Sequence, residues 1–383
     1  MNRWIRSLPS LLGRLARPTA NLRLLQEAAP GVAARPLLHG ALLSGAVVGA
    51  LAANGARFCS SPIQMDSGKA SRPKQVFIRN GQVFECDFGK SELLKRYLGA
   101  YTTARTVDRT SLFAFSQHVT RLINTAQAVW LKEGHSGSEK LQSAEVAQTS
   151  LEKLGPEGLK ALLRSEICAA LAELQHLSKE EASEFQVTIM MTLDTVGPHT
   201  PAGRGFDVYT FAQPMPPMPQ EVKVMAVCAE RDHPTIKDAE WVKVRQGLER
   251  WQEEQGANEV VMFDEHGNFT EGLQTNFFAV SGDGVVLTAP DDRVLSGSIR
   301  KVVIDVCRKN NIPIRFECPT LENMPTWEGC FICSTSRLVK PIFEWEVPNR
   351  KFARKFSRDP TKTTFRLEKL VEEAFRSDSE PLY

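Results

Sequence analysis

Two residues of this chain, a lysine and a distant acid, carry groups that could together hold a reactive aldehyde. Lys237 ends the segment His-Pro-Thr-Ile-Lys, between a run that favours a strand and a run that favours a helix. An amine there is partly desolvated, which lowers its pKa and suits a Schiff base. Glu271 follows about 34 residues later, between two predicted strands, where its carboxylate could pair with a protonated ring nitrogen. Taken alone, such a lysine is more often a solvated surface residue, and such an acid between two strands is more often part of a turn.

A third segment could bind a phosphate. Gly297-Ser298-Ile299 is predicted to open a helix, and the free N–H groups and dipole at such an end attract anions. Thr275 and Thr335, each beside a predicted strand end, could add hydroxyl donors, and Arg121 on an early predicted helix could add a full charge. Ser298 by itself would be an ordinary helix cap. Together the three segments offer amine, ring and phosphate contacts to one aldehyde cofactor.

In this order the segments resemble the class IV aminotransferases, the fold-type IV pyridoxal-phosphate family. That family includes branched-chain and D-amino-acid aminotransferases and aminodeoxychorismate lyase. The resembling segments are Gly99-Ala-Tyr, His118 with Arg121, Phe185-Gln-Val-Thr, Pro234-Thr-Ile-Lys237, Thr270-Glu271-Gly272 with Asn276, Leu295-Ser-Gly297 with Arg300, and Phe331-Ile-Cys-Ser-Thr335 with Pro341. Each is weak alone, and their shared order makes the resemblance specific.

The resemblance implies an α/β (α+β) protein of two domains that acts as a homodimer. Residues 66–210 would form the smaller N-terminal α/β domain, and residues 211–383 the larger C-terminal pseudo-barrel domain that binds pyridoxal 5′-phosphate. Residues 1–65 would be a disordered transit peptide and linker.

The same resemblance implies the roles of the site residues. Lys237 would be catalytic, and the residues that bind the cofactor would be Arg121, Lys237, Glu271, Thr275, Ser298, Ile299 and Thr335. The implied activity moves an amino group from an amino acid to a 2-oxo acid through a Schiff base on Lys237. A lyase of the aminodeoxychorismate type would need the same residues. A noncatalytic protein with this fold would be expected to lack the lysine or the acid.

Three features depart from the family pattern or compete with it. Ser298 precedes Ile299, whereas the family usually places an apolar residue before a hydroxyl. Ile189 and Met190 follow Thr188, where some relatives place an arginine that meets a substrate carboxylate. Lys243 is the nearest rival to Lys237, but it falls inside a predicted helix, away from the strand end.

Composition indicates a globular protein behind a targeting segment. The chain has 383 residues, of which 42% are hydrophobic, so it can bury a sizeable core. Before residue 60, seven arginines and one glutamate give a net charge of +6, so the whole chain's +2 leaves the remainder at −4. This opening is typical of a mitochondrial presequence, with a plastid as second choice. No nucleic-acid surface is expected. The apolar run 40–53 is shorter than the roughly 20 residues of a membrane span.

The eight cysteines are scattered, and no metal site is expected. Cys330-Phe-Ile-Cys333 is a lone CxxC in an apolar run, which favours a buried strand over a zinc or redox site.

The elements that must position these residues are predicted from periodicity and turn residues. We expect a hairpin about Asn80-Gly81, two strands after Gly99, helices at 118–130, 159–177, 241–254 and 299–310, and strands at 185–193, 222–228, 259–263, 277–281, 285–288 and near Phe331. The Gly- and Pro-rich segment 196–219 is expected to cross between domains.

Overall fold

The computed structural model describes residues 75–134, 138–177, 184–193, 203–217 and 219–383. All of these lie in one compact unit, Cys59–Tyr383. The predicted presequence and the apolar run 40–53 lie outside the described residues. Within the described part of the chain, no helix combines the length and the apolar character that a membrane span requires.

The first sheet has seven strands, all paired antiparallel. In spatial order they are β17 (Ser379–Pro381), β4 (Ser111–Phe113), β3 (Ala100–Val107), β5 (Phe185–Leu193), β6 (Phe206–Pro214), β1 (Val76–Arg79) and β2 (Gln82–Phe84). The predicted hairpin is confirmed, because Asn80 and Gly81 both adopt positive φ between β1 and β2.

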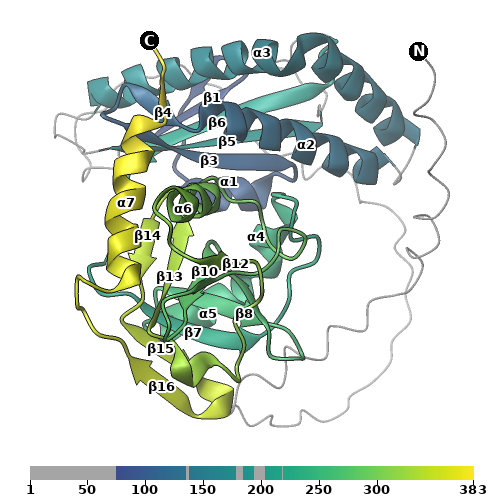
Figure 1. The fold of residues 1–383 in the computed structure, drawn as a ribbon. Helices are drawn as coiled ribbons and strands as arrows, with labels where there is room; N and C mark the ends of the chain where they lie inside the picture. Colours follow the sequence, from purple (N-terminus) through teal and green to yellow (C-terminus); the bar gives the residue numbers. More distant parts are fainter. Residues whose placement is uncertain (1–74, 135–137, 178–183, 194–202, 218) are drawn as a thin grey trace, which may run out of the picture. The chain divides into compact units, whose positions relative to one another are not determined.

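Helices cover both faces of this sheet, as Figure 1 shows. The helices α2 (Phe115–Gly134) and α3 (Ser138–Leu177) pack on the face that includes Ile189. The opposite face, which includes Met190, packs against α1 (Lys90–Arg96) and α4 (Glu240–Val244). Because successive strand residues point to opposite faces, β5 is buried on both sides along its whole length. Ile189 and Met190 are therefore core residues.

Three predicted elements differ from the structure. The segment predicted as a crossing, 196–219, contains β6, a mostly buried strand between β5 and β1; its flanking Gly and Pro residues masked the apolar strand pattern. The predicted helix at 159–177 is the second half of α3, which begins at Ser138 and breaks at Gly155, where φ is 65°. The predicted helix at 241–254 is two helices, α4 and α5 (Gln246–Glu254).

The second sheet has ten strands, and most of the residues predicted for the active site lie in it or in its connecting segments. Its main path runs β12 (Ile314–Arg315), β11 (Val286–Leu287), β10 (Asn276–Val280), β9 (Phe269–Gly272), β8 (Glu259–Phe263), β7 (Lys223–Cys228), β15 (Glu344–Val347) and β16 (Phe352–Lys355), while β13 (Gly329–Ser334) pairs with β10 and β14 (Leu338–Pro341). The helices α6 (Ser298–Lys309) and α7 (Thr363–Ser377) pack on one face of β10 and β13. The predicted mixed α/β fold is confirmed; the boundary between domains near residue 210 stays a prediction.

The CxxC pair lies in β13, as the buried-strand prediction requires. Cys330 and Cys333 point to opposite faces of the sheet and belong to different core clusters. Burial raises the pKa of both thiols. Among the described residues, no group of three or more His, Cys, Asp or Glu side chains could hold a metal ion.

Candidate active site

The loop between β7 and α4 fixes Lys237 against the first sheet. The N–H of Tyr101 donates to the carbonyl of Lys237 at 3.1 Å, and the N–H of Ala239 donates to the carbonyl of Gly99 at 3.0 Å. Gly99 has φ 157°, and a Cβ there would lie 2.3 Å from the carbonyl oxygen of Met191. A side chain at this position would force β3 and β5 apart, so the glycine permits the contacts that place the lysine.

The amine of Lys237 lies over the ring of Tyr101, with its Nζ 4.8 Å from the ring centroid. Desolvation lowers the pKa of Lys237 well below its ordinary value, and the positive charges of Arg121, Arg231 and Arg245 lower it further. A neutral amine keeps the lone pair that attack on a carbonyl carbon requires. Burial and three neighbouring arginines therefore disfavour the protonated form of Lys237.

Lys237 and Glu271, which lies in β9, line the same cavity. Glu271 is the one carboxylate in the wall of that cavity among the described residues. Its Oε1 lies 3.4 Å from Nη1 of Arg231, and its Oε2 accepts from the N–H of Leu295 at 3.0 Å. Burial raises the pKa of Glu271, while Arg231 and the Leu295 N–H oppose the rise. A buried carboxylate with a raised pKa can share a proton with a ring nitrogen.

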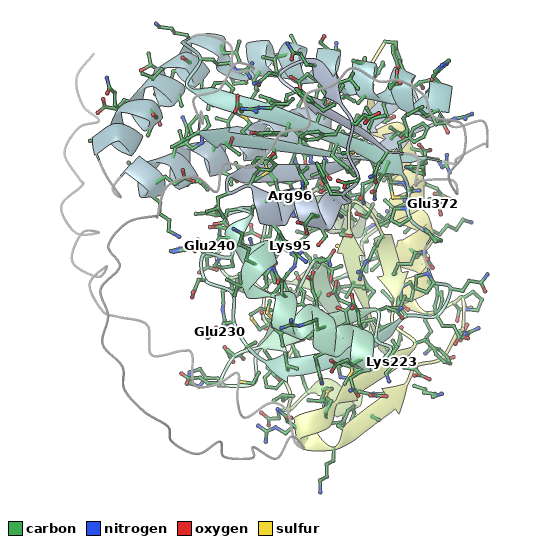
Figure 2. The ribbon with its side chains drawn as sticks, turned by 180° about the vertical axis from the view of Figure 1, so that it is seen from behind. Lys95, Arg96, Lys223, Glu230, Glu240 and Glu372 are labelled. Carbon is green, nitrogen blue, oxygen red and sulfur yellow. The ribbon has the colours of Figure 1, made fainter. Side chains whose placement is uncertain are left out.

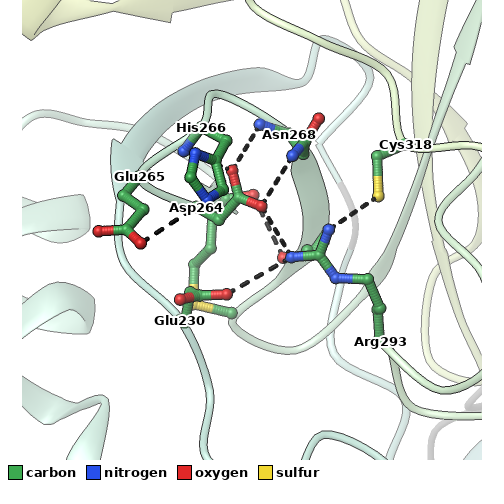
Figure 3. Close-up of polar contacts among 9 residues, drawn as sticks. Glu230, Asp264, Glu265, His266, Asn268, Arg293 and Cys318 are labelled. Carbon is green, nitrogen blue, oxygen red and sulfur yellow. Dashed lines mark hydrogen bonds and ion pairs between the residues drawn. The ribbon is translucent and has the colours of Figure 1, made fainter.

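A polar network around Asp264 holds the side chain of Arg293, as Figure 3 shows. Buried Asp264 follows β8. Its Oδ1 accepts from the N–H of Asn268 at 2.8 Å, and its Oδ2 accepts from Nη2 of Arg293 at 2.9 Å. Although burial raises the pKa of Asp264, these bonds outweigh it and lower the pKa from its ordinary 3.8 to about 2. Arg293, two residues before Leu295, thereby ties the loop that carries Leu295 to the turn between β8 and β9.

We expect Asp264→Asn to destabilise the folded protein by about 2 kcal/mol near pH 7. The folded-state pKa lies below the unfolded one, so the carboxylate stabilises the fold above pH 3.8 and loses that contribution as pH falls towards 2. Urea unfolding at several pH values should show the two proteins converging in acid. The control is Glu265→Gln, because that neighbouring side chain is 82% exposed. Equal stability of Asp264→Asn and wild type at pH 7 would contradict this role.

The start of α6 forms the anion-binding end of the site. Gly297 precedes α6, and a Cβ there would lie 2.2 Å from Oδ1 of Asn276, whose Nδ2 donates to the carbonyl of Leu295 at 2.8 Å. The hydroxyls of Ser298 and Thr335 lie 3.0 Å apart. The first N–H groups of a helix lack partners within it. The residues Ser298 and Ile299 therefore present backbone donors beside two hydroxyls.

Arg121 reaches this end of the cavity from α2. Its Nη1 donates to the carbonyl of Ser296 at 3.5 Å, and its Nη2 donates to Thr102 Oγ1 at 2.7 Å and to His118 Nδ1 at 2.8 Å. Desolvation lowers the pKa of Arg121 to about 10, so it stays charged at neutral pH. Burial, followed by the charge of Arg121, lowers the pKa of His118 well below its ordinary value. A neutral His118 can accept the arginine N–H and orient it.

The residues around this end fit a phosphate-bearing ring. Thr275 Oγ1 and Arg121 Nε are buried and have no hydrogen-bond partner among the described residues. A Cβ on Gly272 would lie 2.3 Å from Thr275 Oγ1, so the glycine leaves room for that hydroxyl. Unpaired buried donors are costly, and a bound anion would satisfy them.

One cavity of about 310 Å³ joins these groups. All seven residues predicted for the site line it: Arg121, Lys237, Glu271, Thr275, Ser298, Ile299 and Thr335. Lys243 is exposed and absent from the lining, as its position inside α4 predicts.

Four basic residues of the cavity wall were not predicted from the sequence. Tyr101 was noted only as part of the segment Gly99-Ala-Tyr, with no role in the site. The missed residues are Lys90, Arg231, Arg245 and Arg337. Arg231 had one local signal, since it lies in the same strand-to-helix loop as Lys237. Arg245 lies eight residues after Lys237, between α4 and α5. Lys90 and Arg337 come from distant segments, and nothing local marks them as site residues.

Comparisons with known proteins agree with this geometry. Residues 99–345 match the model of the protein family described as amino-transferase class IV. A probable branched-chain-amino-acid aminotransferase of Rickettsia typhi is 21% identical over 276 residues, which cover 71% of this chain and 88% of that protein. D-alanine aminotransferase of Listeria monocytogenes is 41% identical over 61 residues, or 16% of this chain and 21% of that protein. The match to the probable branched-chain enzyme of Rickettsia conorii spans 33% of that protein's length, 25% of this chain, at 28% identity.

Solved structures share the fold. The branched-chain amino acid aminotransferase of Escherichia coli superposes with a TM-score of 0.58 at 18% identity, over 80% of this chain and 99% of that one. A hypothetical aminotransferase of Mycobacterium tuberculosis in a PLP-bound form gives a TM-score of 0.57 at 14% identity, over 79% and 99% of the two chains.

Proposed function

Because this chain belongs to the class IV aminotransferase family, we propose that it moves an amino group from an amino acid to a 2-oxo acid with pyridoxal 5′-phosphate as cofactor. One observation carries the proposal: the desolvated Lys237, the buried Glu271 and the donor-rich start of α6 line a single cavity. This arrangement supports contacts to the aldehyde, the ring nitrogen and the phosphate of that cofactor, respectively.

The residues divide the binding between two ends of the cavity. Arg121, Ser298, Thr335 and the N–H groups that open α6 would hold the phosphate, with Thr275 as a further hydroxyl donor. Glu271 would face the ring nitrogen. When bound, the cofactor supplies an aldehyde carbon and a ring that draws electrons from the substrate Cα.

The chemistry then rests on two proton positions. The amine of Lys237, whose pKa burial and neighbouring arginines lower well below its ordinary value, would take the proton from the substrate Cα and later return a proton as general acid. Glu271, which Arg231 and the Leu295 N–H hold in place, would keep a proton on the ring nitrogen of a bound cofactor. The same two residues would serve a lyase, so the fate of the amino nitrogen decides between the two reactions.

The direct test follows that nitrogen. The full chain, loaded with pyridoxal phosphate, is incubated with ¹⁵N-labelled amino acids and a panel of 2-oxo acids. Mass spectrometry should find the label in the amino acid formed from the oxo acid. Label released as ammonium, with elimination of the donor side chain, would favour the lyase. Retention of all label in the donor, across L- and D-amino acids, would contradict both and favour a noncatalytic protein.

Localisation and assembly are part of the proposal. The seven arginines and single acid before residue 60 support mitochondrial import, with a plastid as second choice. A fluorescent protein fused behind residues 1–65 should enter mitochondria; a cytosolic signal would contradict this. We expect a homodimer, as the resemblance implies, and a monomer by sedimentation would overturn that expectation.

A further inference from the structure

The cavity wall carries more cationic groups than the cofactor would use. Its lining contains six basic side chains, Lys90, Arg121, Arg231, Lys237, Arg245 and Arg337, and one acid, Glu271. If the proposed function holds, Arg121 faces the phosphate, Lys237 meets the aldehyde, and Arg231 pairs with Glu271. Three basic side chains, Lys90, Arg245 and Arg337, remain without a proposed contact to the cofactor.

Lys90 is the least satisfied of these three. It is the first residue of α1, which packs against α4; Figure 2 labels Lys95 and Arg96 on α1 and Glu240 on α4. Within the described part of the chain, the Lys90 ammonium has no hydrogen-bond or ion-pair partner. Desolvation, with the nearby charges of Arg245, Lys237 and Arg337, lowers the pKa of Lys90 to about 8. Lys90 is therefore still mostly protonated at neutral pH, and no carboxylate among the described residues pairs with its charge.

The two arginines are fixed in the wall and keep donors to spare. Nε of Arg245 donates to Glu249 at 2.8 Å and its Nη1 to the carbonyl of Leu273 at 3.0 Å. Nη1 of Arg337 donates to buried Glu259 at 3.0 Å. Both carboxylates lie outside the cavity lining. The Nη2 group of each arginine has no partner among the described residues, so both are preorganised to receive an anion.

An amino acid brings one carboxylate on its Cα, and one cation satisfies it. An apolar side chain placed against Lys90 would leave its desolvated charge unpaired, which is costly. The strand position where an arginine would serve some relatives is filled by core residues, Ile189 and Met190. The recognition of acidic groups therefore has to come from other elements.

We propose that Lys90, supported by Arg245 and Arg337, binds a carboxylate on the substrate side chain, so that the enzyme selects acidic amino acids and rejects branched-chain ones. This inference rests on the proposed function. Lys90 acts here as a specificity residue, and the preferred substrates are dicarboxylic amino acids and their 2-oxo acids.

The test pairs substrates of similar size that differ in the second carboxylate. For the full holoenzyme, kcat/KM for glutamate should exceed that for norvaline by about 30-fold or more, in whichever enantiomer reacts. Lys90→Met should remove most of that ratio by raising KM for glutamate, with little loss for norvaline. Lys95→Met, on the same helix but outside the cavity lining, should keep the wild-type ratio.

A binding measurement separates this inference from the reaction. Calorimetry should show glutarate binding the full chain more tightly than pentanoate, and Lys90→Met should abolish the difference. Equal affinity of wild type for both acids, or norvaline and leucine reacting as well as glutamate, would overturn the role of Lys90. Failure of every donor to transfer nitrogen would defeat the proposed function alone, because glutarate binding still reports on Lys90.

Discussion

Replacing Lys237 with alanine is expected to lower amino transfer by roughly 10⁴-fold or more. The reason is that this side chain has two tasks, capture of the carbonyl carbon and movement of the Cα proton. The arginines around it cannot replace it as a base, because a guanidinium keeps its proton at neutral pH. Single-turnover measurements with excess pyridoxal phosphate and the best donor give the rate of the proton step directly.

The matched control for this variant is Lys243→Ala. Lys243 lies six residues further on, in α4, and is exposed outside the cavity. Its removal should leave the turnover rate within about two-fold of wild type, because surface substitutions rarely change more. A Lys237→Ala enzyme with a tenth of wild-type activity, or a Lys243→Ala enzyme with none, would reassign the catalytic lysine.

The second large effect is expected at Glu271. Glu271→Gln should lower kcat by about 10²- to 10³-fold, since the amide cannot hold a proton on the ring nitrogen as a carboxylate does. The amide oxygen can still accept from the Leu295 N–H, so we expect cofactor affinity to fall much less than kcat. Steady-state kinetics at saturating cofactor, beside equilibrium binding of the cofactor, separate the two effects.

Loss of the Arg231 partner could also destabilise the Glu271→Gln protein, so its unfolding in urea must be measured beside the kinetics. Breaking a buried pair by removing one charge costs about 3–5 kcal/mol in known cases. A folded, cofactor-loaded variant with unchanged kcat would contradict the role of Glu271 at the ring nitrogen.

The sequence was sufficient for the parts of the site that depend on local pattern. The strand-to-helix loop with Lys237 and the glycine before α6 follow from turn residues and apolar periodicity. Glu271 is expected between two strands, whereas the structure places it within a short buried strand of its own, β9, which the apolar pattern does not mark. Their shared order supplied the family, and the family supplied the fold. The structure adds that all seven predicted residues line one cavity.

Other features escaped sequence reasoning because they depend on packing between distant segments. Lys90 reads as an ordinary helix-start lysine, and only the fold brings it to the same cavity as Arg245 and Arg337. β6 was missed because its glycine- and proline-rich surroundings resemble a linker, although burial between β5 and β1 stabilises it as a strand. Ile189 and Met190 stand where some relatives place an arginine that binds a substrate carboxylate. Because both faces of the first sheet are covered by helices, these two residues are part of the hydrophobic core.

The covalent site of the cofactor tests the central claim most directly. The full chain is loaded with pyridoxal phosphate, reduced with borohydride and digested, and the modified lysine is located by mass spectrometry. We predict a pyridoxyl group on Lys237 and on no other lysine of the cavity or of α4. Modification of Lys90 or Lys243 in its place, or a protein without any specific adduct, would contradict the account.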